Sequence, residues 1–226
     1  MAHKSEKYDT APDCGLFIRL SDTLLGLDLV RAVREIFFVI NHGETAYKRN
    51  SHILYCGQVL IDSLSKDQLA TIVTLTKSQG IVVLLENNAT LAGDIEAEGV
   101  LLDDEADILK ARQIIGEEGI IGLRCGIDID RAEAAIEKGA DFVSFHTQNK
   151  SLADPKIAAV WSTLSDMPCV MEGPFTNDYV SAYVQSGADF IDAGDYIFNH
   201  KKGVKQGTVN MMHAIELALD TPRSIQ

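Results

Sequence analysis

Residues 138–143 read KGADFV, and residues 186–191 repeat the pattern as SGADFI. In each copy a glycine closes a helical segment, and a Phe followed by Val or Ile opens an apolar, strand-like one. Gly139 and Gly187 therefore mark the same helix-to-strand junction at two places. A junction that recurs within one chain is typical of a fold built from repeated strand–helix units.

Short segments rich in Val, Ile, Leu and Phe extend this unit along the chain. Most are apolar throughout rather than alternating, as expected for parallel strands covered by helices. We expect strands at residues 15–20, 52–56, 81–85, 99–102, 120–123, 142–145, 168–171 and 190–193. Helical patterns separate them, so the fold class is α/β with right-handed crossovers. Eight such units in 226 residues predict a closed (β/α)8 TIM barrel.

Local signals mark where some helices begin and end. Ser65 and Gln68 have the spacing of a capping box, and Asp154 before Pro155 predicts a helix start. Residues 131–138 read as a helix.

Two segments are open to more than one interpretation. Thr176 or Asn177 caps a helix that runs to Ser186. Residues 37–40 (FFVI) form either an extra strand or the apolar end of the first helix, and residues 42–44 read as a loop.

Composition limits the classes of partner. Hydrophobic residues make up 46% of the chain, charged residues 23%, and the net charge is −13. These values are typical of a globular protein and argue against binding to nucleic acid or to an anionic membrane, which needs a cationic surface. No apolar run approaches the roughly 20 residues of a membrane span.

The remaining organisation follows from the chain ends and the cysteines. The polar residues 1–13 lack the apolar stretch of a secretory signal, so we expect a flexible lead-in, a single barrel domain over residues 14–220 and a tail at 221–226. The cysteines are far apart, which predicts reduced, core-filling thiols and a cytoplasmic protein; they are Cys14, Cys56, Cys125 and Cys169.

In a TIM barrel the functional residues follow the carboxyl ends of the strands. The polar residues at these places are Glu86, Asn87 and Asn88, the acidic run 103–107, Arg124, the run from Thr147 to Lys150, Gly173, and Gly194 with Asp195. One interpretation is that the acidic run and Glu86 together hold Mg²⁺. The other is that the acidic residues of the run stand there because the N-terminus of a helix favours negative charge. Arg124 either binds a phosphate through two hydrogen bonds of its guanidinium group or pairs with nearby carboxylates.

From residue 81 onward the chain resembles the thiamine-phosphate synthase family. The phrases that carry the resemblance are residues 81–87 (IVVLLEN), 98–102 (EGVLL), 111–112 with 120–123 (IIGL), 139–143 (GADFV), 168–170 (PCV) with Gly173, and 187–189 (GAD) leading to 197–198. The resemblance implies coupling of a hydroxymethylpyrimidine diphosphate to a thiazole phosphate, with release of pyrophosphate and use of Mg²⁺.

The strand-end residues and the resemblance together predict three groups of site residues. They are Arg124 and Lys150 as catalytic cations; Asn87, Asn88, Thr147, Gly173, Gly194 and Asp195 as substrate-binding residues; and Glu86, Glu105 and Asp107 as metal ligands. Several positions depart from the family pattern. Asn87 replaces a metal-binding Asp, Arg124 and Asp195 each replace a Ser, and Pro174 replaces the second Gly of a pair.

The replacement by Asp195 weakens the expected phosphate site. A carboxylate about 4 Å from a phosphate charge costs on the order of 4 kcal/mol at an effective dielectric constant near 20. Three hypotheses follow: a divergent enzyme of the family, a non-catalytic relative that acts as a binding or assembly partner, and an enzyme that acts on a cationic or neutral substrate. Exposed helices of barrels also allow a homodimer, and Met211 and Met212 belong either to such a contact or to the core.

Overall fold

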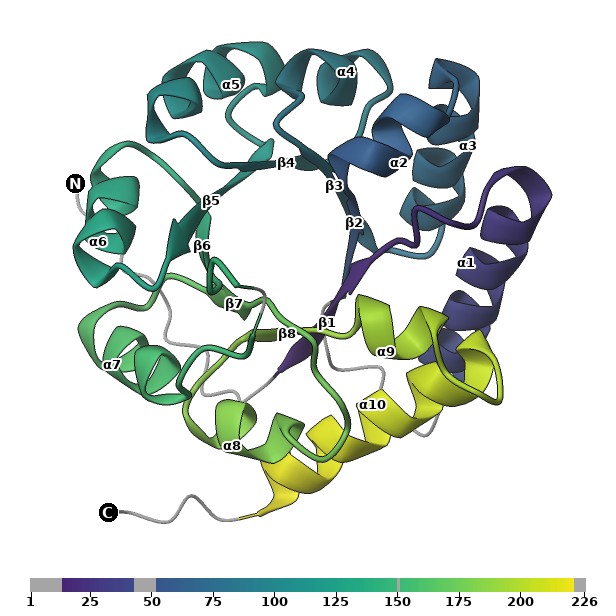
Figure 1. Cartoon of the computed structure of the whole chain (residues 1–226). Helices are drawn as coiled ribbons and strands as arrows, with labels where there is room; N and C mark the ends of the chain where they lie inside the picture. Colours follow the sequence, from purple (N-terminus) through teal and green to yellow (C-terminus); the bar gives the residue numbers. More distant parts are fainter. Residues whose placement is uncertain (1–13, 43–51, 150, 222–226) are drawn as a thin grey trace.

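The computed structural model describes residues 14–42, 52–149 and 151–221. Eight strands close a barrel in sequence order, with helices around the outside (Figure 1). Each strand pairs in parallel with the next, and β8 pairs with β1. The predicted (β/α)8 TIM barrel is confirmed.

The strands are β1 (Gly15–Arg19), β2 (Ile53–Cys56), β3 (Val82–Glu86), β4 (Gly99–Leu102), β5 (Ile120–Gly126), β6 (Phe142–Phe145), β7 (Cys169–Met171) and β8 (Phe190–Asp192). The helices are α1 (Gly26–His42), α2 (Gln58–Ser63), α3 (Lys66–Lys77), α4 (Ala89–Asp94), the 3-10 turn η2 (Glu105–Asp107), α5 (Ile108–Ile115), α6 (Ile129–Glu137), α7 (Lys156–Leu164), α8 (Val180–Gln185), α9 (Gly194–Phe198) and α10 (Val204–Asp220). All eight predicted strands are present, and β5 continues to Gly126 instead of ending at residue 123.

Two apolar layers hold the barrel together. A small cluster fills the inside of the barrel and consists of Phe17, Ile53, Tyr55, Leu84, Leu101, Phe142 and Val170. A larger cluster lies between the strands and the surrounding helices. Gly122 leaves room for the inner cluster, since a Cβ atom there would lie 2.1 Å from the Phe142 ring. Successive strand side chains alternate between the two layers.

The expected helix starts are largely observed. Both halves of the Ser65–Gln68 capping box are present at the start of α3. The Asp154 carboxylate accepts a hydrogen bond from the Lys156 N–H group, 2.9 Å away, at the start of α7. The helix expected at residues 131–138 is α6, which begins earlier, at Ile129, with Asp128 as its cap.

The structure resolves one open interpretation and corrects another. Residues 37–40 belong to α1 and do not form an extra strand, because Phe37, Val39 and Ile40 continue the buried face of that helix while Phe38 is exposed. The cap expected at Thr176 or Asn177 is wrong: α8 begins after Tyr179, which makes no side-chain capping hydrogen bond. Of the expected loop at residues 42–44, His42 is instead the last residue of α1. Residues 43 and 44 lie outside the described residues, as do residues 1–13 and the tail beyond residue 221.

Other expectations concern burial. Cys14, Cys56, Cys125 and Cys169 are all buried, as expected for core-filling thiols. Met211 and Met212 are also buried, so they belong to the core and do not form an exposed contact. Within the described part of the chain, no helix is both long and apolar enough to span a bilayer.

Candidate functional site at the barrel mouth

A ring of polar side chains lies above the apolar filling of the barrel, at the carboxyl ends of the strands. Side chains two positions apart on a strand point to the same side, so the residues that follow the inner cluster also face inward. We call this ring the mouth layer; it consists of Arg19, Tyr55, Glu86, Asp103, Arg124, Ser144, Glu172 and Asp192. The alternation of the strands thus places four carboxyl groups and two guanidinium groups around one opening.

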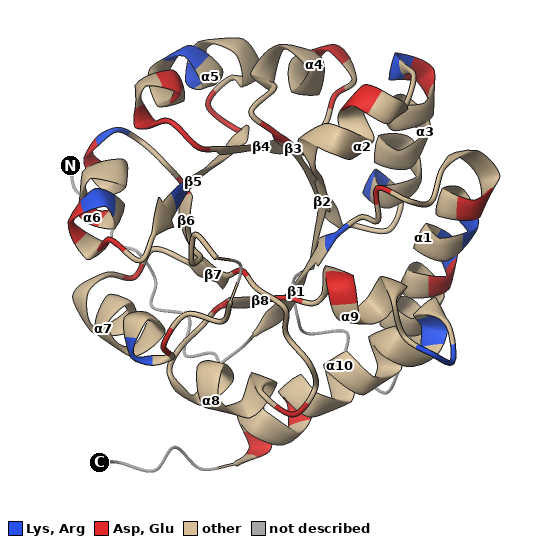
Figure 2. Ribbon diagram, viewed as in Figure 1, with Lys and Arg blue, Asp and Glu red and all other residues tan. Residues whose placement is uncertain are grey.

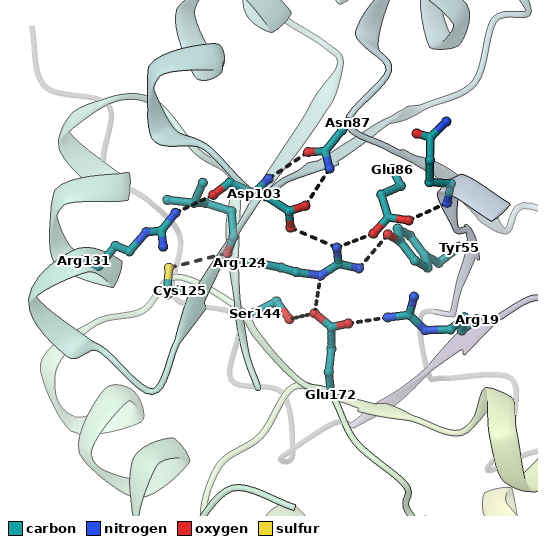
Figure 3. Close-up of polar contacts among 12 residues, drawn as sticks. Arg19, Tyr55, Glu86, Asn87, Asp103, Arg124, Cys125, Arg131, Ser144 and Glu172 are labelled. Carbon is teal, nitrogen blue, oxygen red and sulfur yellow. Dashed lines mark hydrogen bonds and ion pairs between the residues drawn. The ribbon is translucent and has the colours of Figure 1, made fainter. Parts of the chain in front are cut away.

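Arg124 lies at the centre of the mouth layer, and every nitrogen of its guanidinium group donates a hydrogen bond (Figure 3). Nη1 lies 2.5 Å from Glu86 Oε1 and 3.0 Å from Asp103 Oδ1. Nε lies 2.9 Å from Glu172 Oε1, and Nη2 lies 2.5 Å from the Tyr55 hydroxyl. Of the two roles considered for Arg124, the structure therefore shows pairing with carboxylates.

Glu172 joins Arg124 to the second arginine of the mouth layer. Its Oε2 atom lies 2.5 Å from Nη2 of Arg19, and its Oε1 atom also accepts a hydrogen bond from the Ser144 hydroxyl. The Glu172 side chain is only 6% exposed. A carboxylate so deeply buried requires such partners, because an unpaired buried charge is strongly destabilising.

The arginines keep three of the carboxylates ionised. Burial alone would raise the pKa of Glu172, but Arg124 and Arg19 hold it below its usual range. The pKa of Glu86 is lowered in the same way, against burial, by hydrogen bonds from Arg124 and from the Gln58 N–H group. The hydrogen bond from Asn87 and the contacts with Arg124 likewise lower the pKa of Asp103.

Asp192 is different. Burial raises its pKa to about 7, against the opposing effect of Arg19. Its Oδ1 atom accepts a hydrogen bond from the Gly194 N–H group at 3.1 Å, and its Oδ2 atom lies 3.8 Å from Arg19 Nε. Asp192 is therefore the carboxyl group of the mouth layer that can exchange a proton near neutral pH.

A cavity of about 780 Å³ opens above the mouth layer. All eight strands contribute to its lining, through their last residues or the segments that follow them. Outside the mouth layer, most side chains that line the cavity are polar: Ser21, Asp22, Thr23, Gln58, Arg131, His146, Thr147, Ser151, Asp195 and Asn199. A neighbouring groove of about 630 Å³ is lined by Arg131 and by five acidic residues, Asp103, Asp104, Glu105, Asp128 and Asp130. Figure 2 shows acidic residues spread over the loops and helices around the barrel.

The structure brings together about half of the residues that the sequence singled out. Six of them line the cavity: Glu86, Arg124, Thr147, Gly173, Gly194 and Asp195. Asn87 supports the layer from outside the cavity, because its side-chain amide exchanges two hydrogen bonds with Asp103, at 2.6 and 2.8 Å. Asn88 caps α4 through the Leu91 N–H group. Lys150 lies outside the described residues.

The expected metal ligands do not meet. Glu86 contacts Arg124, whereas the Glu105 carboxylate lies 2.6 Å from Lys138 Nζ, and Asp107 is exposed at the start of α5. Among the residues that the structure describes, no three His, Cys, Asp or Glu side chains are grouped so that they could hold a metal ion.

Five residues of the mouth layer were not among the site residues expected from the sequence: Arg19, Tyr55, Ser144, Glu172 and Asp192. Arg19 gives the clearest signal, because it is a charged residue at the end of an otherwise apolar strand. In each case the residue two positions earlier faces the barrel interior, so the period of the strands could have identified all of them.

Comparisons with known proteins place this barrel among its relatives. Residues 59–194 match the family model described as thiamine monophosphate synthase. The chain is 30% identical over 137 residues to the thiamine-phosphate synthase of Rhodospirillum centenum, an alignment that covers 57% of this chain and 66% of the relative. It is also 30% identical over 153 residues to the enzyme of the same name from Hyphomonas neptunium, covering 64% of this chain and 69% of the relative.

Among solved structures, the thiamine phosphate pyrophosphorylase of Pyrococcus furiosus superposes with a TM-score of 0.71 at 19% identity, covering 92% of this chain and 98% of that one. At this identity the superposition supports the fold. The family match covers more than half of the chain and includes the ends of strands β3 to β8. This chain therefore belongs to the thiamine monophosphate synthase family.

Proposed function

We propose that this protein acts in thiamine biosynthesis as a transferase of the thiamine-phosphate synthase type, with its substrates bound in the cavity at the barrel mouth. The observation that carries the proposal is the lining of that cavity by the carboxyl ends of all eight strands, or the segments that follow them, in a member of this family. A volume of about 780 Å³ lies within the range of pockets that enclose small molecules. The substrates implied by the family are hydroxymethylpyrimidine diphosphate and thiazole phosphate.

The charges of the mouth layer limit how a diphosphate can bind. Arg19 and Arg124 already pair with carboxylates, so their positive charge is largely offset before a ligand arrives. Arg131 reaches the cavity from its edge, where its guanidinium donates to the Asp103 carbonyl. We propose that Arg131, together with Lys150, meets the phosphate groups, because a departing diphosphate needs cations and N–H donors around it.

The family resemblance also implies Mg²⁺, but the carboxylates of the mouth layer do not fit this role as they are arranged. Each ionised carboxylate at the mouth already accepts hydrogen bonds from protein donors on both of its oxygen atoms. No step of the proposed function is therefore assigned to a metal held by these residues.

The proposal is tested by incubating the full chain with both substrates and measuring thiamine phosphate and pyrophosphate. We expect both products to form in equal amounts, well above the background without protein. Ser21→Trp should abolish the reaction by filling the cavity, whereas Ser78→Trp, on an exposed residue at the end of α3, should not change it. Absence of product in the presence of both bound substrates would contradict the proposal.

A second candidate function is a non-catalytic relative that binds the same precursors or a partner protein. The neutralised guanidinium groups at the mouth favour this candidate, since a diphosphate would meet few uncommitted positive charges among the described residues there. Titration of each substrate separates the two candidates: binding without turnover supports the non-catalytic relative, and turnover excludes it.

A further inference from the structure

The guanidinium group of Arg124 occupies the meeting point of three ionised carboxylates. Glu86 reaches it from the end of β3, Asp103 from the end of β4 and Glu172 from the end of β7 (Figure 3). The same guanidinium nitrogen, Nη1, bridges Glu86 and Asp103, at 2.5 and 3.0 Å. These two carboxylates lie at the ends of the paired strands β3 and β4, and the positive charge between them offsets their mutual repulsion.

Three carboxylates converge here from separate strands, and carboxylate oxygens are the ligands that a divalent cation such as Mg²⁺ prefers. With Arg124 in place, these carboxylates are not grouped closely enough among the described residues to hold a metal ion themselves. Here the protein supplies the cation itself. The Arg124 residue is only 8% exposed, and its ring of acceptors is completed by the Tyr55 hydroxyl. A metal ion could not enter between Glu86 and Asp103 without displacing this guanidinium.

The outer oxygen atoms of the three carboxylates are also engaged. Glu86 Oε2 accepts a hydrogen bond from the Gln58 N–H group, and Asp103 Oδ2 accepts one from the Asn87 amide at 2.6 Å. Glu172 Oε2 lies 2.5 Å from the Arg19 guanidinium. The outer oxygen atoms of the three carboxylates therefore already accept hydrogen bonds from protein donors, while Arg124 is their common counter-ion.

We propose that Arg124 is the resident cation of the barrel mouth and occupies the position among Glu86, Asp103 and Glu172 that a divalent metal ion would need. The mouth layer then keeps its shape without added metal. Ligands bind to a site in which the guanidinium group of Arg124 is held in one orientation by its hydrogen bonds. A guanidinium carries a single charge and directs it through planar donors, whereas a metal ion would accept a ligand oxygen directly. The inference concerns the protein's own counter-ion and does not depend on whether the coupling reaction takes place.

The test is a titration of the full chain with Mn²⁺ alone, in which the electron paramagnetic resonance signal of Mn²⁺ is measured after each addition. If wild-type protein binds any Mn²⁺, Glu86→Gln should leave that binding unchanged. Arg124→Ala should create a Mn²⁺ site, with an affinity at least about tenfold tighter than any binding to wild type, a change of about 1.4 kcal/mol. Adding Glu86→Gln to Arg124→Ala should remove it again.

Lys138→Ala is the matched control, because it also removes one positive charge and releases one carboxylate, that of Glu105. It should create no Mn²⁺ site, since Lys138 pairs with one carboxylate, that of Glu105, whereas Arg124 pairs with three. The proposal is overturned if folded Arg124→Ala gains no Mn²⁺ affinity. It is equally overturned if wild-type protein binds Mn²⁺ and Glu86→Gln or Asp103→Asn abolishes that binding, a result that does not require the Arg124 variant to fold.

Discussion

The Oδ2 atom of Asp192 lies 3.8 Å from the Nε atom of Arg19, beyond hydrogen-bond distance but within the range of an ion pair. Glu172 makes the closer contact with the same guanidinium, at 2.5 Å. Arg19 is therefore shared unequally, and Asp192 is left as a buried carboxyl group with weak compensation. This explains why burial dominates its pKa although an arginine is nearby.

We expect Asp192 to make stability depend on pH near neutrality. Burial raises the pKa of Asp192 to about 7 in the folded protein, whereas the ordinary pKa of the free group is 3.8. The folded state therefore binds more protons between these values, so the contribution of Asp192 to the free energy of unfolding falls as pH rises through this window. Asp192→Asn removes the effect, and its stability relative to wild type should rise by about 2–3 kcal/mol between about pH 5 and pH 8. Urea unfolding at the two pH values measures this, and parallel behaviour of the two proteins would contradict it.

Glu172→Gln should destabilise the protein strongly. The substitution leaves Arg124 and Arg19 without their shared buried carboxylate, and breaking such a pair costs about 3–5 kcal/mol. Asp94→Asn is the matched control, since its ion pair with Lys66 is more than half exposed on both sides and should contribute less than about 1 kcal/mol. Equal losses for the two variants in urea unfolding would show that the mouth layer does not stabilise the barrel.

Gly99→Ala should also weaken the barrel. A Cβ atom at Gly99 would lie 1.9 Å from the Ile120 carbonyl oxygen on the paired strand β5, so the two strands would have to separate. We expect a loss of about 1–3 kcal/mol, the usual cost of overpacking. Gly93→Ala adds the same methyl group in α4, where the nearest atom is 3.4 Å away, and should stabilise by up to about 1 kcal/mol through helix propensity. A stability equal to wild type for Gly99→Ala would mean that the strand spacing is less rigid than the contacts suggest.

Asp195→Ser should tighten the binding of inorganic phosphate. Asp195 lines the cavity in the first turn of α9, and removing its negative charge removes a repulsion of on the order of 4 kcal/mol if the phosphate binds about 4 Å away. The increase in affinity should be at least about tenfold by calorimetry. Asp220→Asn, at the end of α10 and outside the cavity lining, removes the same charge and should leave phosphate binding unchanged. An unchanged affinity for Asp195→Ser would place the phosphate elsewhere in the mouth.

The local pattern of the chain was sufficient to predict the barrel. The repeated GAD junctions, the apolar strand segments and the capping box at Ser65 are short-range features, and each is set by backbone conformation within a few residues. The same reasoning failed at Thr176 and Asn177, because a capping residue in a sequence shows only that a helix could begin there.

The sequence by itself also determined which residue types stand at the strand ends, Arg124 and Glu86 among them. Only the tertiary structure decided how they are used. The closure of the barrel brings the ends of β3, β4, β5 and β7 to one opening, and contacts such as that between Arg124 and Glu172 join residues 48 positions apart. Whether an arginine faces a ligand or a carboxylate depends on such long-range neighbours, because an ion pair is set by distance in space and by burial, neither of which local sequence specifies.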